Sequence, residues 1–462
     1  MKRILGLSAI LALAALTLAC GGGTVASNTG GGGGSTPQSQ VFVTGEDAPL
    51  PSVVAFNVTI NSITLNNSST SVTALSTPTT VDFGRLVGMR SLLGFNTIPA
   101  GTYTSATFTL ANPVISYVDL AQDPPTLSQL DGTLTTSTVT VPFPSAMVVG
   151  ANDLGGLHID FDVRKSLQTD SNGQITGVVD PTIDIMAVSA SNDEGQITEF
   201  TGSVVSVAAT SNQFTMQGPY GFQEVIDVNS STKFNGSYTI NNLPSQSITA
   251  VEGTVQDDGS ILASEVEVVS TDKSFISGRI LAVNPTSGPV QSVTMFVGET
   301  LPALQSIPVD SVQTIDLSGV PANQFDVCFF DNWFSTLLFN NSSLIVGQRI
   351  FIGGTYDTTT NVFTPSMVSL RRQGTVGSLQ ANSVSITNGN LGSFQLANDG
   401  LLEFSANGPF TVETGNLTNF INIDGLTGLE SAGSAEIVAR GLVFKDANGQ
   451  PQMWAHRVRI LQ

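Results

Sequence analysis

The segment Leu157-His158-Ile159-Asp160-Phe161-Asp162-Val163 alternates apolar and polar residues without a break. A period of two places the apolar side chains on one face of a β-strand and the polar ones on the other. Shorter alternating segments recur at residues 56–60 and 103–108, and Asp-Gly or Asn-Gly pairs typical of tight hairpin turns separate segments of this kind. No long stretch has the periodicity of a helix. The sequence therefore predicts an all-β protein composed of sandwiches or small barrels.

Composition limits the classes of function. The 462 residues include 40% hydrophobic and only 11% charged residues, which excludes a wholly disordered chain. With 16 Lys and Arg against 36 Asp and Glu, the net charge of -20 provides no basic surface for nucleic acid. Two cysteines cannot form a disulfide scaffold, and two histidines leave little material for histidine chemistry.

The first twenty residues have the layout of a secretory signal peptide. Lys2 and Arg3 precede an apolar run, residues 4–18, that is too short to span a bilayer comfortably, and Ala19-Cys20 follows it. This ending resembles the bacterial lipoprotein signal. The resemblance implies cleavage before Cys20 and acylation of that residue, which would anchor the chain in a membrane of the cell envelope. In such lipoproteins an Asp at the position after the cysteine is associated with retention in the inner membrane, so the resemblance implies that Gly21 favours the outer membrane. The alternative is an ordinary signal peptide that happens to be followed by a cysteine.

Residues 21–40 are dominated by Gly and Ser, so nothing in them can be buried. They predict a flexible tether with a reach of about 25 Å. We expect this tether to hold the folded part of the protein away from the lipid surface.

Residues 41–190 carry an ordered set of motifs. These are VFVTGEDAPLPSV, VVAFNVTINSITL, VDFGRL, SLLGFNTIPAGTYTSATFTL and LHIDFDVRKSL, followed by a strand that bears Pro181. In this order they resemble a family of bacterial envelope lipoproteins with no assigned activity, the domain of unknown function numbered 4382. The resemblance implies a β-sandwich. The residues themselves also predict a β-sandwich. Pro99-Ala100-Gly101 is typical of a tight turn, and the strand that follows it has one apolar and one polar face.

Residues 199–462 contain a threefold repeat, with predicted modules at 199–271, 273–372 and 373–462. Each copy opens with a strand around Gly202, Gly278 or Gly374 and closes with an apolar strand followed by a hairpin. The copies resemble a second uncharacterised family, numbered 5666. The predicted fold is therefore an N-terminal β-sandwich followed by three small β-barrel-like modules, since closed barrels remove exposed strand edges.

His158, Asp160 and Asp162 share one face of their strand and form a candidate site for a divalent cation. The same spacing also places polar groups on the solvent face of any two-faced strand. Arg164 would pair with a carboxylate and compete with a metal. The solvent-facing interpretation is favoured, and no metal or other cofactor is predicted.

The second module contains an insertion, DVCFFDNWFSTLLFNNS, that concentrates aromatic residues. If exposed, Phe329, Phe330, Trp333 and Phe334 would form a patch for a glycan, a lipid or a protein partner. The favoured alternative is that the insertion packs onto its own module or a neighbouring one. Cys328 is expected to be a small buried hydrophobic residue, although an unpaired thiol could also form an intermolecular bridge.

Two short patterns and the last strand complete the candidates. Asp170–Gly173 and Asp446–Gly449 each begin like a calcium loop, but they lack its later acidic ligands and predict hairpin turns. In the last strand, alternation places Trp454 and His456 on one face with Val458. Arg457 and Arg459 would take the other face, where the first copy has Glu265 and Glu267. Opposite charges could dock these copies, but surface ion pairs contribute only about 0–1 kcal/mol.

The sequence favours a non-catalytic protein. It has no nucleophile elbow, no phosphate-binding loop and no dinucleotide fingerprint. We expect a lipid-anchored protein that binds, adheres or scaffolds at the cell envelope, with the membrane and an envelope or extracellular polymer or protein as partners. One alternative is a carbohydrate-active enzyme that uses two carboxylates about 5–10 Å apart in a cleft. The other is a structural module stabilised by calcium.

Overall fold

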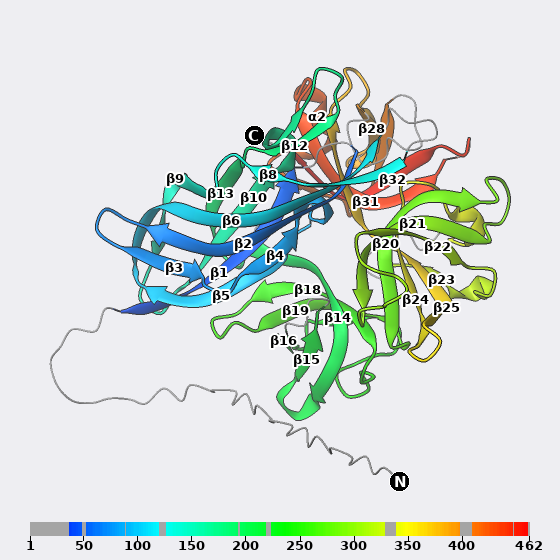
Figure 1. Cartoon of the computed structure of the whole chain (residues 1–462), viewed down its shortest axis with the longest axis horizontal. Coiled ribbons are helices and arrows are strands. Elements are labelled where there is room, and N and C mark those ends of the chain that lie inside the picture. Colours follow the sequence, from blue (N-terminus) through cyan, green and yellow to red (C-terminus); the bar gives the residue numbers. More distant parts are fainter. Residues whose placement is uncertain are drawn as a thin grey trace, which may run out of the picture. The chain divides into compact units, whose positions relative to one another are not determined.

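Two facing sheets build the N-terminal part of the computed structural model (Figure 1). The structure describes residues 37–48, 52–87, 89–119, 126–192, 195–218, 223–328, 339–397, 409–446 and 448–460. The first sheet has the strand order β13-β10-β1-β5, in which β1 and β10 run parallel and the other pairs antiparallel. Its strands are β1 (Gln38–Ala48), β5 (Ser91–Pro99), β10 (Leu154–Asp162) and β13 (Ile183–Val188).

The second sheet has six strands and is fully antiparallel. Its central strands β2 and β6 pair along most of their length, with β3 and β4 on β2 and with β7 and β9 on β6. The strands are β2 (Val53–Asn66), β3 (Ser71–Leu75), β4 (Thr79–Asp82), β6 (Gly101–Asp119), β7 (Thr126–Asp131) and β9 (Thr138–Val149). A small sheet of β8 (Thr133–Leu134), β11 (Leu167–Thr169) and β12 (Ile175–Val179), the 3-10 turn η1 (Phe83–Arg85) and the one-turn helix α1 (Val163–Ser166) complete this part.

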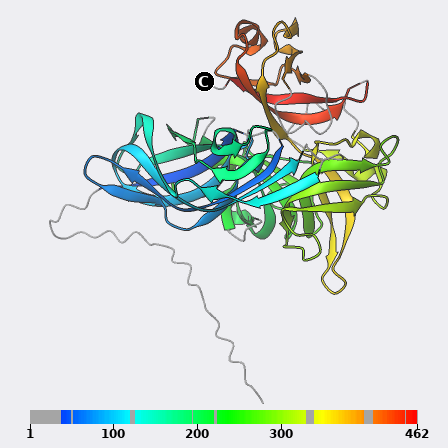
Figure 2. The same ribbon diagram turned by 45° about the horizontal axis from the view of Figure 1, so that its top comes forward.

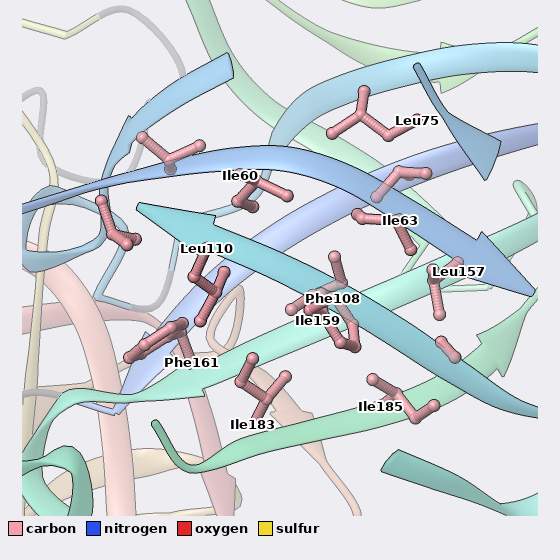
Figure 3. Close-up of a cluster of buried hydrophobic side chains, with 14 of the residues drawn as sticks. Ile60, Ile63, Leu75, Phe108, Leu110, Leu157, Ile159, Phe161, Ile183 and Ile185 are labelled. Atoms are coloured by element: carbon pink, nitrogen blue, oxygen red, sulfur yellow. The ribbon is translucent and has the colours of Figure 1, made fainter. Parts of the chain in front are cut away.

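The core of the sandwich is formed by the apolar half of each alternating strand (Figure 3). Leu157, Ile159 and Phe161 of β10 are all buried and face residues such as Ile60 and Phe108 of the second sheet. Each such side chain contributes about 1.5–3 kcal/mol when it is fully buried. The predicted β-sandwich is confirmed, and alternation is the reason that it forms.

Three smaller units follow the sandwich, and their strands can be traced by colour in Figure 2, from green to red. We call them module 1 (Gln196–Ser270), module 2 (Ser274–Leu370) and module 3 (Gln373–Ile460). The strands of module 1 are β14 (Gln196–Ala208), β15 (Gln213–Gln217), β16 (Gln223–Asp227), β17 (Lys233–Phe234), β18 (Ile248–Val255) and β19 (Ile261–Ser270). Those of module 2 are β20 (Ser274–Asn284), β21 (Ser292–Leu301), β22 (Ser311–Asp316), β23 (Phe325–Val327), β24 (Arg349–Asp357) and β25 (Val362–Leu370).

Module 3 contains β26 (Gln373–Ser378), β27 (Ser385–Asn388), β28 (Leu391–Leu396), β29 (Phe410–Thr414), β30 (Asn419–Ile421), β31 (Glu436–Lys445) and β32 (Pro451–Ile460), with helix α2 (Gly425–Ser431). Modules 1 and 2 share one strand order, β16-β15-β14-β18-β19-β17 and β22-β21-β20-β24-β25-β23. A parallel pairing with the last strand closes the barrel in modules 1 and 3, where β16 pairs with β19 and β29 pairs with β32. The predicted repeat of small β modules is confirmed, and the closed order is that of an OB-type barrel.

The polar face of β10 is not exposed to solvent, contrary to the favoured prediction. His158 is only 3% exposed and Asp162 only 6% exposed. At one end of this face Phe42 of β1 packs into the core of module 1, and at the other end Arg459 of module 3 pairs with Glu46. The prediction failed because alternation identifies two faces but does not show that a later module covers the second one.

Among the described residues, no helix has the length and apolar character that a membrane crossing requires.

Candidate functional site

Three neighbouring strands of the first sheet bring carboxylates into one row. Glu46 of β1 lies opposite Asp160 of β10, and Asp160 lies opposite Asp184 of β13. Residues paired in this way point to the same side of a sheet, about 4.5–5.5 Å apart at their Cβ atoms. The next row contains Thr44 and His158. We call Glu46, Asp160 and Asp184 the carboxylate row.

Arg459 of β32 provides the main positive charge beside this row. Its Nη2 lies 2.8 Å from Oε1 of Glu46, while Nε2 of His158 lies 3.6 Å from Oε2 of the same carboxylate. A hydrogen bond of 3.1 Å between Thr44 Oγ1 and His158 Nδ1 fixes the orientation of the imidazole. Burial opposes the ionisation of Glu46, but Arg459 and other nearby cations outweigh it, so the pKa of Glu46 lies below its usual value.

At Asp160 the effects that raise the pKa outweigh those that lower it. Burial and the neighbouring charge of Glu46 raise the pKa of Asp160 to about 7, although Arg459 acts against them. Its Oδ1 is buried and accepts no hydrogen bond from any described residue. One row therefore contains an ionised carboxylate, Glu46, beside a carboxyl group that is half protonated near neutral pH.

A cleft of about 350 Å³ opens beside the carboxylate row. Asp160, Asp184, His158 and Arg459 line it. Apolar side chains from β9 and β13 line it as well, including Val141, Pro142, Pro144 and Met186. Its volume is near the lower end of the range for small-molecule sites. The arrangement could hold a small ligand that offers hydrogen-bond donors to carboxylates and an apolar flank to the prolines.

The three candidate metal ligands do not converge. Asp162 turns away from the row to begin helix α1, where its Oδ1 accepts from the backbone N–H of Lys165 at 2.8 Å and its Oδ2 pairs with Lys165 Nζ at 2.7 Å. His158 and Asp160 stay on the sheet. Arg164 lies on the helix and pairs with Glu436 of module 3 instead of a carboxylate on β10. No group of three His, Cys, Asp or Glu side chains in the described part of the chain suits a metal ion.

A second concentration of charge lies where the modules meet. Glu199 of β14 is buried and lies 2.9 Å from Nη2 of Arg371 and 3.1 Å from Nη1 of Arg349. Arg371 also lies 2.8 Å from Glu267, and Arg440 approaches Glu199 at 3.7 Å. Burial opposes the ionisation of Glu199, but the three guanidinium groups lower its pKa to about 2. We call these five residues the charge hub.

The charge hub joins all three modules, since Glu199 and Glu267 belong to module 1, Arg349 to module 2 and Arg440 to module 3. Sequence reasoning considered docking of opposite charges between copies but assigned it to exposed pairs. Arg371 is instead fully buried, and such pairs differ from surface pairs because removing one partner leaves an uncompensated charge. The signal available in the sequence was Arg371-Arg372, two adjacent cations at a module boundary in a chain with few cations.

The last strand differs from its predicted pattern because of a bulge. In the pairing of β31 with β32, Arg440 lies opposite Arg457 but Gly441 lies opposite Ala455, so His456 is an extra residue. The bulge reverses the phase of alternation. Ala455 and Val458 therefore both enter the core of module 3, while Trp454 packs against the core of module 2.

The remaining candidates divide between described and undescribed residues. Cys20 and the aromatic residues Phe329, Phe330, Trp333 and Phe334 lie outside the described residues. Cys328, at the edge of the insertion, is 2% exposed and belongs to the core of module 2, as expected.

The two Asp-x-Asn-Gly patterns form turns. Asp170 Oδ1 accepts from the backbone N–H groups of Asn172 and Gln174, and Asp446 Oδ1 accepts from those of Asn448 and Gln450. The glycine of each pattern has a positive φ. These aspartates are thus occupied by their own backbone, which fits the turn prediction.

Comparison with known proteins gives one family match. No curated protein matches the chain. Among solved structures, a fly protein described as "drosophila Unr CSD456" was found at 8% identity, covering 57% of this chain and 98% of that one, but with a TM-score of only 0.13 it carries no argument. The model of the family Domain of unknown function (DUF4382) matches residues 38–176, which is the greater part of the sandwich and includes both Glu46 and Asp160.

Proposed function

We propose that this protein is a lipid-anchored, non-catalytic binding or scaffold protein of the bacterial cell envelope. The N-terminal sequence supports the anchor, because an apolar run ends at Cys20 and a Gly-rich tether follows it. Several acyl chains on one terminus would give stable membrane attachment, since each buried CH₂ contributes roughly 0.8 kcal/mol.

One structural observation carries the scaffold role: the cations of the chain are used to join its β modules. Arg349, Arg371 and Arg440 lie in the charge hub, and Arg459 pairs with Glu46 of the sandwich. The whole chain is strongly acidic, with 36 Asp and Glu against 16 Lys and Arg, and four of these cations are committed to the contacts just named. An acidic body is repelled by an anionic lipid surface, which supports display at a distance on the tether.

The anchor can be tested in the bacterium that produces the protein, or in a host that processes lipoproteins. We expect metabolic labelling with a palmitate analogue to label the wild-type chain and mass spectrometry to find an acylated Cys20 at the mature terminus. Cys20→Ser should lose the label and leave the membrane fraction, while Cys328→Ser, the matched control, should keep both. An unlabelled wild-type chain that retains Met1 would refute the proposal.

Binding can be tested with the soluble part of the chain. The binding hypothesis assigns contact with an envelope or extracellular polymer to the aromatic insertion, although packing of the insertion onto a module is the favoured expectation from the sequence. A pull-down with envelope extracts and a glycan array should therefore lose signal when Phe329, Phe330, Trp333 and Phe334 are replaced together by Ser. Equal retention by this variant and the wild type would remove the insertion as the binding surface.

One observation favours an enzyme as the second candidate. Asp160 and Asp184 are adjacent carboxylates at the wall of a cleft, and the pKa of Asp160 is about 7, as a general acid requires. If the chain cleaves glycosidic bonds, Asp160→Asn and Asp184→Asn should each lower turnover of a susceptible polysaccharide by a factor of about 10² or more. Failure of the wild type to release reducing ends from envelope and extracellular polysaccharides would exclude this candidate for those substrates.

A further inference from the structure

A cavity of about 40 Å³ lies where the sandwich, module 2 and module 3 meet. Strands β20 and β24 contribute Arg279 and Arg349, turn η1 contributes Arg85, and β26 contributes Gln373. A site of about 10–15 Å³ suffices for one water molecule. The cavity therefore has room for one monatomic or small polyatomic ion.

Two arginines lie side by side at the wall of this cavity. In the antiparallel pairing of β20 with β24, Arg279 lies directly opposite Arg349, so both side chains leave the sheet on the same side. Like charges in directly opposite positions destabilise a sheet unless something compensates them. Such a pair requires a compensating charge nearby.

Arg349 forms an ion pair that compensates its charge, whereas no such ion pair is found for Arg279 among the described residues. Nη1 of Arg349 lies 3.1 Å from Glu199 and donates to the backbone oxygen of Arg372 at 3.0 Å. Nη1 of Arg279 is buried and forms no hydrogen bond with any described residue. Arg85, the third cation at the cavity, is paired with Glu299.

One carboxylate, Asp82 of β4, also lines the cavity and acts on the charge of Arg279, but it is already engaged. Its Oδ1 accepts from the backbone N–H of Phe56 at 2.9 Å. Burial raises the pKa of Asp82 to about 6, even though Arg85 acts against this. Burial and Arg349 lower the pKa of Arg279 only to about 10, so its guanidinium stays charged at neutral pH.

The backbone around the cavity also leaves room. Gly298 of β21 is the extra residue of a bulge, since Ser277 lies opposite Glu299 and Gly278 lies opposite Val297. A bulge residue is left out of the ladder of backbone hydrogen bonds. A Cβ atom built on Gly298 would meet nothing closer than the backbone oxygen of Ser277 at 3.8 Å. A bulge glycine without a side chain and the buried Nη1 of Arg279 thus line the same small space.

We propose that this cavity binds a small monovalent anion of the halide type against the guanidinium of Arg279. The anion would compensate the facing arginines of β20 and β24 and would stabilise the junction between the sandwich and module 2. This site is separate from the cleft beside the carboxylate row and does not depend on the proposed function.

The test compares halide with a bulky anion at constant ionic strength. Thermal unfolding of the soluble chain would be followed in sodium gluconate while sodium chloride or bromide replaces it stepwise. A ligand that binds only the folded state raises Tm as its concentration passes Kd. We expect a saturable rise of roughly 2–4 °C for the wild type, and none for Arg279→Met. Lys233→Met, which removes one exposed charge of module 1 that does not line the cavity, should keep the full rise.

A second measurement does not depend on how the variants fold. In crystals of the wild-type chain soaked in bromide, anomalous diffraction should show a peak within hydrogen-bonding distance of Nη1 of Arg279. An empty or water-filled cavity in bromide, or equal Tm values in gluconate and chloride, would overturn the proposal.

Discussion

Strands β6 and β10 have the same alternating pattern, yet their polar faces have different surroundings. On β6 the outward residues are hydroxyls, and Thr107 pairs with Thr140 of β9 through a hydrogen bond of 2.8 Å between partly exposed side chains. On β10 the outward residues are His158, which is buried, and Asp160, and beside them Arg459 of module 3, from much later in the chain, pairs with Glu46. The type of polar residue distinguishes the two faces: small hydroxyls stay in contact with water, whereas ionisable groups mark the face that meets another module.

The comparison teaches where stability is concentrated. When two surface hydroxyls pair, hydrogen bonds to water are replaced by a hydrogen bond within the protein, so the net gain in folding free energy is small. A buried ion gains little net free energy either, but removing its partner is costly because the remaining charge cannot be hydrated. The covered face and the charge hub should therefore be sensitive to single substitutions, and the open face should tolerate them.

The largest effect is expected at Arg371, which lies between Glu199 and Glu267 and is fully buried. Replacement by Met removes the cation that lies 2.8 Å from Glu267 and 4.8 Å above the ring of Phe351. We expect Arg371→Met to destabilise the chain by about 3–5 kcal/mol, measured as a shift in urea unfolding monitored by tryptophan fluorescence and circular dichroism.

A double variant provides the control for Arg371. If the loss comes from uncompensated charge, Arg371→Met combined with Glu267→Gln should recover part of the stability, so the two effects should not add. Strictly additive effects would show that packing, and not charge, accounts for the loss.

The covered face itself is tested at Arg459, whose guanidinium compensates Glu46. Arg459→Met should cost about 2–3 kcal/mol, less than Arg371→Met because Arg459 is partly exposed and His158 also lies near Glu46. The same urea titration measures it. An effect below that of a typical surface substitution, about 0.5 kcal/mol, would contradict the view that module 3 seals this face through charge.

A pH series sharpens the comparison, because the carboxylate row on the covered face contains a carboxyl group with a strongly raised pKa. Asp160 has a pKa of about 7 in the folded chain, against 3.8 as its ordinary value. Between these pH values the folded state holds a proton that the unfolded state has released, so stability falls as pH rises from about 4 to 7. Asp160→Asn should match the wild type at pH 4 and exceed it by about 1–3 kcal/mol at pH 8.

The control for the pH series is Asp170→Asn, which changes an exposed turn carboxylate. The pKa of Asp170 is lowered by hydrogen bonds from the backbone N–H groups of Gln174 and Asn172, so neutralising it should not raise stability at pH 8. If Asp160→Asn were no more stable than the wild type at pH 8, the raised pKa of Asp160 would be wrong.

Much of the fold follows from sequence patterns that act over short distances. Alternation at Leu157, Ile159 and Phe161 predicted which side chains enter the sandwich core, and the repeat around Gly202 and Gly278 predicted that the later modules would share one plan. These are local rules, since they depend on the pleat of a strand and on the chemistry of a turn.

The site could not be predicted in the same way, because it depends on which modules touch. Arg459 and Glu46 are 413 residues apart, and nothing in either segment identifies the other as its partner. The bulge at His456 shifted the phase of the last strand, and the register that places Arg279 opposite Arg349 is set by two strands separated by the aromatic insertion. Long-range pairing and bulges leave little trace in a single sequence.

The smallest effect is expected on the open face, at the pair formed by Thr107 and Thr140. Thr140→Ala removes one exposed hydroxyl hydrogen bond and a β-branched side chain, and water can hydrate Thr107 afterwards. We expect a loss of at most about 0.5 kcal/mol in the same urea titration, with no dependence on pH between 4 and 8. A loss as large as that of Arg459→Met would mean that the hydroxyl ladder of the sandwich stabilises the chain as strongly as its buried ions do. The contrast between the two faces would then lie in what covers them and not in how they stabilise the fold.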